Sequence, residues 1–239
     1  MGPVTIIIDD IIDSGKTRER FAEEYPGIPF YALVNKPKET AITSWVVFPW
    51  EMADESLGPS EAVRRILQAI GDDPKREGLQ GTPERVVKSW EEIFSGYSTD
   101  VASLMTVFTE GACDEMVILK NVEFYSNCEH HIQPFYGKAH LAYIPDGKVI
   151  GISKLARILE VFSRRLQIQE RIGAQWTAAI NEHLSPLGAA CILEAKHFCM
   201  TCRGVNKQGS TMVTSSLTGA FKTDSSTRNE LMLHLERSV

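Results

Sequence analysis

Cys128-Glu129-His130-His131 lies between two segments that have strand patterns, and the rest of the sequence can be interpreted outward from it. Met116 to Tyr125 and Lys138 to Ile144 are the two segments, so the four residues predict a loop between consecutive strands. A thiolate and an imidazole at this spacing can bind one metal ion. A third ligand is required, and His197-Phe198-Cys199-Met200-Thr201-Cys202 offers one.

Two arrangements of ligands are compatible with these spacings. In the first, Cys128, His131 and Cys199 bind zinc and leave a fourth position open, where bound water becomes a nucleophile at neutral pH. In the second, Cys202 completes a closed, structural site with four ligands. Spacing alone favours neither arrangement.

The residues around the ligands favour the open arrangement. Alternation from Ala189 to Cys199 predicts a strand with one face formed by Cys191, Leu193, Ala195, His197 and Cys199. Cys202 lies three residues further on and faces away if the strand continues. The open arrangement also leaves His130 and His197 uncoordinated, and imidazoles suit proton transfer near neutral pH.

Helical patterns follow the two strands around the loop. A helix is predicted to start at Gly151-Ile152-Ser153-Lys154, with a buried face formed by Leu155, Ile158, Leu159 and Phe162. Lys154 and Arg157 are three residues apart and can point out of this helix together. A second helix is expected from about Gln169 to His183, and a last strand from about Thr211 to Thr218 precedes a short C-terminal helix.

Two further helices are predicted before the strands. The first has an apolar face formed by Val63, Ile66, Leu67 and Ile70, and it ends at Gly71. The second begins with Thr82 as N-cap and Pro83 at the first helical position, and it ends at Ser95-Gly96. Its expected buried side consists of Val86, Trp90, Ile93 and Phe94.

The composition is that of a globular protein, with 43% hydrophobic and 23% charged residues among 239. The formal net charge of -6 argues against a nucleic-acid partner, because binding to phosphate backbones needs a basic surface. We see neither a membrane span nor a signal peptide, so no membrane partner and a cytoplasmic location are expected. The five cysteines then favour metal binding over a disulfide framework.

Residues 1–52 resemble a fragment of another family. Val4 to Ile8 reads as a strand, and Asp9 to Thr17 as an acidic, small-residue loop that leads into a helix. This resembles the phosphoribosyl-pyrophosphate loop of purine phosphoribosyltransferases, and Trp45 to Glu51 resembles the end of the xanthine/hypoxanthine-type members. Such a transferase needs several more strands, so we expect a strand-helix-strand appendage without transferase activity.

The remainder of the chain closely resembles GTP cyclohydrolase I. The match spans about Pro59 to the C-terminus, and it divides the chain into residues 1–52, an N-terminal helical region at 53–115 and a catalytic domain at 116–239. It rests on several motifs in order: Thr82 to Val86, Cys128 to His131, Tyr143-Ile144-Pro145, Gly151 to Arg157, Gln167 to Arg171, and His197 through Val205.

The resemblance implies a reaction and roles for the residues that match. The enzyme is a hydrolase acting on carbon-nitrogen bonds of a cyclic amidine, which opens GTP at C8 and forms formate and 7,8-dihydroneopterin triphosphate. Zinc is the implied cofactor and GTP the implied partner. The implied zinc ligands are Cys128, His131 and Cys199, and the implied catalytic residues are His130, His197 and Ser153. Substrate contacts fall on Glu170, Gln169, Lys154, Arg157, Arg203 and, from a neighbouring subunit, Arg85.

The resemblance also implies an α+β fold and an assembly. The expected fold is the tunnelling fold, an antiparallel four-stranded sheet with two long helices on one face, here with N-terminal helices and a short α/β appendage. A homodecamer with sites between subunits is expected. The product would serve folate, tetrahydrobiopterin or 7-deazaguanine synthesis alike. Two alternatives remain at this point: a catalytically silent, zinc-stabilised nucleotide-binding oligomer of the same fold, and a remnant phosphoribosyltransferase activity.

Overall fold

The computed structural model describes residues 7–12, 16–28, 30–35, 58–111 and 113–236. The chain divides into two units, residues 1–57 and 58–239, which are described separately. In the first unit β1 (Ile7–Ile12) pairs in parallel with β2 (Phe30–Asn35), and α1 (Lys16–Glu24) lies between them in sequence.

This unit has the strand-helix-strand order expected from the sequence, but its first strand is placed differently. Asp9 and Asp10 lie within β1 and not in a loop after it, because the strand continues through the two isoleucines that follow them. The segment from Trp45 to Glu51 lies outside the described residues, as do Val4 and the small residues of the expected loop at 14–15.

The second unit is built on a sheet of five strands in the order β7-β4-β5-β8-β9. Four of them, β4 (Val117–Cys128), β5 (Pro134–Ile144), β8 (Gly188–His197) and β9 (Met212–Leu217), are antiparallel. The fifth, β7 (Leu166–Gln167), is a two-residue edge strand parallel to β4. The predicted four-stranded antiparallel sheet and α+β class are confirmed, and β7 is an addition.

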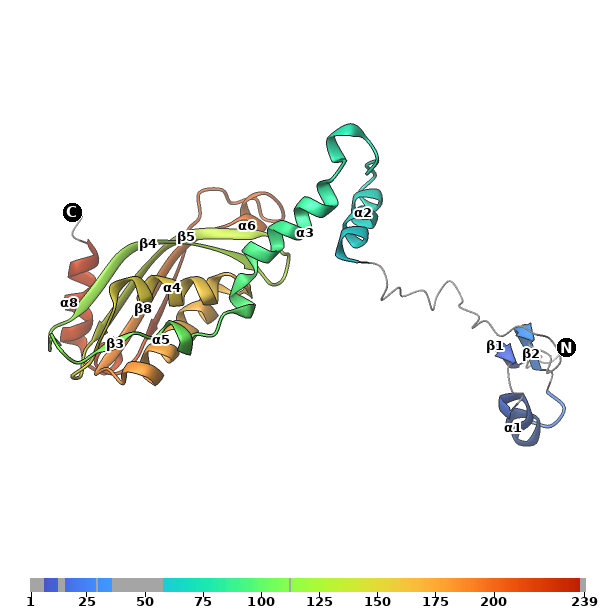
Figure 1. The fold of residues 1–239 in the computed structure, drawn as a ribbon, viewed down its shortest axis with the longest axis horizontal. Coiled ribbons are helices and arrows are strands. Elements are labelled where there is room, and N and C mark those ends of the chain that lie inside the picture. The colour runs from blue at the N-terminus through green and yellow to red at the C-terminus, as the bar shows by residue number, and fades with distance from the viewer. Residues whose placement is uncertain (1–6, 13–15, 29, 36–57, 112, 237–239) are drawn as a thin grey trace. The chain divides into compact units, whose positions relative to one another are not determined.

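One face of this sheet is covered by α4 (Ile152–Ser163) and α5 (Gln169–Leu184) (Figure 1). Their apolar stripes form the main core with the strands, and Trp176 is fully buried while its indole N–H donates to the Leu155 carbonyl at 3.1 Å. Each large apolar side chain buried in this way stabilises the fold by about 1.5–3 kcal/mol. The predicted buried face of α4 is buried as expected, at Leu155, Ile158, Leu159 and Phe162.

The opposite face of the sheet has a smaller apolar cluster. Two C-terminal helices, α7 (Ala220–Thr223) and α8 (Ser225–Glu236), contribute Phe221 and Leu231 to it. Strand alternation accounts for the division, because Ala142, Ala190 and Ile192 point to this face while their sequence neighbours point to the main core.

The N-terminal helices of the second unit are α2 (Pro59–Ala69) and α3 (Thr82–Ile93). Thr82 is the first helical residue and not the N-cap as predicted. The cap is Gly81, whose φ of 69° lies in the left-handed region that favours glycine.

The apolar faces of α2 and α3 are only partly covered by the residues that the structure describes. Ile66 and Ile70 are 56% and 72% exposed, and Trp90 and Ile93 are each 37% exposed although they were expected to be buried. The helical period correctly identified an apolar face, but it does not tell whether the same chain covers that face.

The remaining elements are short. The strands β3 (Val107–Phe108) and β6 (Val149–Ile150) form an antiparallel pair, α6 (Phe198–Thr201) is a single turn, and 3-10 turns lie at Glu77–Leu79, Ser95–Ser98 and Ala102–Leu104. Among the described helices, none combines the length and the apolar character that crossing a membrane requires.

Candidate metal centre

A tight reversal between β4 and β5 presents the first two candidate ligands. Cys128 is the last residue of β4, and its N–H donates to the Gln133 carbonyl at 2.8 Å. The Ile132 N–H donates back to the Cys128 carbonyl at 2.8 Å, and Ile132 has a φ of 53°. These bonds close the loop and hold His131 within it.

The third candidate ligand comes from α6. The predicted strand ends at His197, so Cys199 lies in a single helical turn and not on the strand face expected for it. The other residues of that face were predicted correctly, since Cys191, Leu193 and Ala195 all belong to the main core. The helical turn changes the direction of the chain and carries Cys199 toward the loop.

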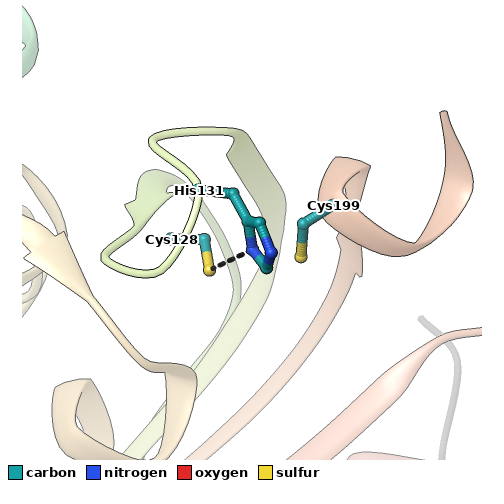
Figure 2. A group of neighbouring side chains, drawn as sticks. All are labelled: Cys128, His131 and Cys199. Carbon is teal, nitrogen blue, oxygen red and sulfur yellow. Dashed lines mark hydrogen bonds between the residues drawn. The ribbon is translucent and has the colours of Figure 1, made fainter. Parts of the chain in front are cut away.

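Cys128, His131 and Cys199 form one group whose ligand atoms all lie within 4.8 Å of one another. Figure 2 shows the His131 ring between the two sulfurs, and its Nδ1 is 3.8 Å from Cys128 Sγ. Two thiols and an imidazole are the donor set that zinc prefers, so the residues fit this metal. Burial, with the nearby Cys128, raises the pKa of Cys199, and Arg203 opposes that rise.

Cys202 is not a member of this group among the described residues. It is exposed at the end of α6, and its Sγ lies 2.9 Å from the Phe198 carbonyl. This geometry corresponds to the open arrangement, in which three protein ligands leave one position for another molecule.

The two surplus histidines lie on either side of the candidate ligands. His130 is exposed, and its Nδ1 is 3.9 Å from Cys128 Sγ. His197 stacks on Phe135 with ring centroids 4.4 Å apart, and its Nε2 is 2.8 Å from Gln169 Oε1. Burial lowers the pKa of His197, and the carboxylate of Glu170 acts against this shift.

Gln169 is placed to orient His197. Its side chain is buried, and its Nε2 donates to the Leu193 carbonyl at 2.9 Å, the Met212 carbonyl at 3.1 Å and Thr214 Oγ1 at 3.1 Å. Because the amide nitrogen faces three acceptors, its oxygen must face His197. A neutral His197 therefore carries its proton on Nε2.

Sequence analysis missed an ion pair beside the metal group. Arg171 donates two hydrogen bonds to Glu129, at 2.5 and 3.0 Å, and the Glu129 N–H donates to the Gln167 carbonyl at 3.1 Å. The Arg171 guanidinium lowers the pKa of Glu129. Both residues lie inside the motifs quoted above, but nothing in the sequence marks two residues 42 positions apart as partners.

The helix α4 starts at the other end of the sheet. The Ile150 N–H, just before α4, donates to the hydroxyl of Tyr143, and Tyr143 pairs with Val117 at the start of β4. Cys128 is at the opposite end of that twelve-residue strand, about 36 Å away at 3.3 Å per residue. Ser153 and Lys154, in the first turn of α4, are thus far from the metal group, and Arg157 lies one turn further along the helix.

Two of the three remaining predicted contacts lie near the metal group, and the third lies on α3. Glu170 is exposed at the start of α5, beside Gln169, and Arg203 is exposed just after α6. Arg85 instead donates to the Gln80 carbonyl and to Thr82 Oγ1 at the start of its own helix. The chain therefore brings together the metal ligands, both histidines and Glu170, but not the cations of α3 and α4.

Comparison with known proteins gives a family for most of this chain. The family model described as GTP cyclohydrolase I matches residues 59–236. GTP cyclohydrolase 1 of Wolinella succinogenes is 56% identical over 185 residues, which are 77% of this chain and 99% of that protein. The proteins of the same name from Caldanaerobacter subterraneus and Chlorobaculum tepidum are 51% and 50% identical over 72% and 75% of this chain, and over 92% and 81% of their own lengths.

Proposed function

The chain belongs to the GTP cyclohydrolase I family, and from this premise we propose that it hydrolyses GTP at C8 to formate and 7,8-dihydroneopterin triphosphate. The observation that carries the proposal is the group of Cys128, His131 and Cys199 with two uncoordinated histidines beside it. A closed structural site would have no use for those histidines.

Zinc is the metal that these three residues would hold. When bound, it supplies the Lewis acidity that makes water a nucleophile at neutral pH. The chain contributes a group in which Cys128 is buried and His131 is exposed, so a substrate can reach the open side. Both thiols must lose their protons when the metal binds, which makes occupancy depend on pH.

The two histidines would move protons during ring opening and hydrolysis. His197 is held by stacking on Phe135 and by its bond to Gln169, so Nδ1 is the nitrogen that can accept a proton. His130 is exposed and adjoins the ligand Cys128, so it can exchange protons with solvent. Ser153, in the matching role of the family, would assist the loss of the C2′ proton in the later rearrangement.

Recognition of GTP would divide between a carboxylate and several cations. Glu170 is exposed beside His197 and offers two oxygens to the N–H donors at the edge of guanine. Lys154, Arg157 and Arg203 would bind the triphosphate, and their positive charge suits this anion in a protein with net charge -6.

A complete site would require a second copy of the chain. The start of α4 lies far from the metal group of its own chain, so a neighbouring α4 would have to supply Ser153, Lys154 and Arg157. Arg85 would likewise come from a neighbour. This supports a homo-oligomer with sites between subunits, and we propose the homodecamer of the family. We further propose that residues 1–52 are an appendage without transferase activity.

Turnover of GTP by the purified, zinc-quantified protein tests this function. We expect the pterin absorbance to increase and one formate to be released for each pterin formed. Both should stop when a chelator removes the metal. Stoichiometric zinc without either product would contradict the proposal and favour a catalytically silent, zinc-stabilised protein.

A further inference from the structure

We propose that Glu129 and Arg171 are positioning residues that hold the metal loop against the segment that orients His197 and binds the base. The metal loop is residues 128–133, and the base segment is residues 166–171. This inference rests on the proposed function, because it assigns a role within that same site. Neither residue would touch GTP or the metal.

The contact between the two side chains is bidentate. Arg171 Nη1 and Nη2 each donate to a different oxygen of Glu129, at 2.5 and 3.0 Å. Two parallel, charge-assisted bonds between planar groups fix orientation as well as distance. The Glu129 side chain remains 30% exposed and the Arg171 side chain 41% exposed. Exposed ion pairs contribute little to the free energy of folding. A large effect on stability is therefore not the expected role of this pair.

The pair reinforces backbone contacts between the same two segments. Cys128 is in register with Gln167 across the β4–β7 pairing, and the Glu129 N–H donates to the Gln167 carbonyl at 3.1 Å. The β7 strand has only two residues, so it offers few bonds of its own. Besides the Cys128–Gln167 pairing and the Glu129 backbone bond, the Glu129–Arg171 side-chain pair adds a third connection. It lies beyond the end of the β4–β7 pairing.

The two connected segments carry different parts of the site. Glu129 lies between the ligands Cys128 and His131, and its Oε1 is 3.9 Å from His130 Nε2. Arg171 follows Glu170, and Gln169 before them holds His197. A misplacement of 1 Å between reacting groups can reduce a rate about 100-fold. The pair thus sets the position of the metal ligands relative to the groups that must act with them.

A double-mutant cycle tests the inference with the full-length protein. We expect Glu129→Gln and Arg171→Gln each to lower kcat about tenfold, to change KM for GTP less than about threefold, and to leave Tm unchanged. The double variant should be no worse than the poorer single one, since both remove the same contact. Arg171→Lys should not restore kcat, because an ammonium cannot make the bidentate contact.

Binding of Co²⁺ provides a readout that does not depend on turnover. We expect Glu129→Gln to bind one Co²⁺ per chain about tenfold more weakly than the wild type, with an altered visible absorption spectrum. Asp72→Asn is the matched control, because Asp72 and Arg76 form another bidentate pair, with both bonds at 2.8 Å, outside the site. It should leave both Co²⁺ binding and kcat unchanged.

The outcomes separate this inference from the proposed function. Additive losses, full rescue by Arg171→Lys, or a fall in Tm that parallels the loss of kcat would each overturn the positioning role. If the wild type does not convert GTP, the proposed function fails. The Co²⁺ affinity of Glu129→Gln then decides whether the positioning role is correct. An affinity equal to that of the wild type overturns this role, and a tenfold weaker affinity with unchanged Tm supports it.

Discussion

The helices α4 and α5 cover the same face of the sheet, yet their first turns serve different regions. α5 begins with Gln169, Glu170 and Arg171, which contact or adjoin His197 and Glu129 next to the metal group of their own chain. α4 begins with Ser153 and Lys154 at the opposite end of β4. Both first turns carry residues that the sequence predicted to belong to the site, but only the first turn of α5 lies beside the metal group.

The chain path explains this difference. α4 runs toward the metal end and is followed by β7, which pairs with the last residues of β4, and α5 then starts beside the loop. Consecutive helices on one face joined by a short connection run in opposite directions, so their N-termini lie at opposite ends. Within one chain the first turns of α4 and α5 therefore lie at opposite ends of the sheet.

At the end of the sheet where α5 starts, here called the α5 end, the loss of a metal ligand should produce the largest effect on activity. Cys199→Ser leaves only two good zinc ligands, because the serine hydroxyl binds zinc poorly at neutral pH. We therefore expect loss of zinc and a fall in kcat/KM of more than about 100-fold. Zinc analysis and GTP turnover measure this. Cys113→Ser is the matched control, since Cys113 is exposed and outside the group, and it should behave as the wild type. Retained zinc in Cys199→Ser would contradict the ligand assignment.

Mixing variants of the two helix ends tests whether they meet between chains. Arg157→Ala removes a cation of α4, and His197→Ala removes a histidine of the metal end, so each protein alone should be nearly inactive. When subunits exchange at equal concentrations, about one quarter of the sites combine two intact halves, and about a quarter of wild-type activity should return. Mixing His130→Ala with His197→Ala is the control and should restore none. Absence of recovery in the first mixture would place the site within one chain.

The sequence predicted those parts of the fold that depend on local periodicity. The buried stripe of α4 and the core-facing residues of β8 were correct, because apolar spacing reports directly which side of an element is buried. The same rule failed for Trp90 and Ile93, which are partly exposed. The sequence of one chain identifies an apolar face, but it does not tell which residues, from this chain or another, pack against that face.

The site was predicted in its residues more than in its contacts. The order of the motifs identified Cys128, His131 and Cys199, which the structure brings into one group. Strand alternation placed Cys199 incorrectly, because it could not show that a helical turn begins after His197. The burial of Gln169 could not be predicted, since the acceptors that its side chain contacts come from β8 and β9, far away in sequence.

Gln169→Leu should have an intermediate effect at the α5 end. The change removes the amide that forms hydrogen bonds with two backbone carbonyls and the His197 ring. We therefore expect a loss of about 2–3 kcal/mol in the free energy of unfolding. We expect kcat to fall about tenfold, because His197 is no longer held. Chemical denaturation and steady-state kinetics measure the two. Thr214→Val removes a single bond to Gln169 and should keep kcat near wild type; unchanged kcat in Gln169→Leu would show that His197 is positioned by stacking alone.

Cys202→Ser should have the smallest effect, and it decides whether the α5 end contains an open site. Cys202 is exposed, and its thiol donates a hydrogen bond to the Phe198 carbonyl, which a serine hydroxyl can also make. Exposed substitutions of this kind usually change stability by less than about 0.5 kcal/mol, so we expect one zinc per chain and kcat within about twofold of wild type. Loss of zinc would make Cys202 a fourth ligand. In that case no position would remain for water, and the groups gathered at the start of α5 would stabilise a structural metal site.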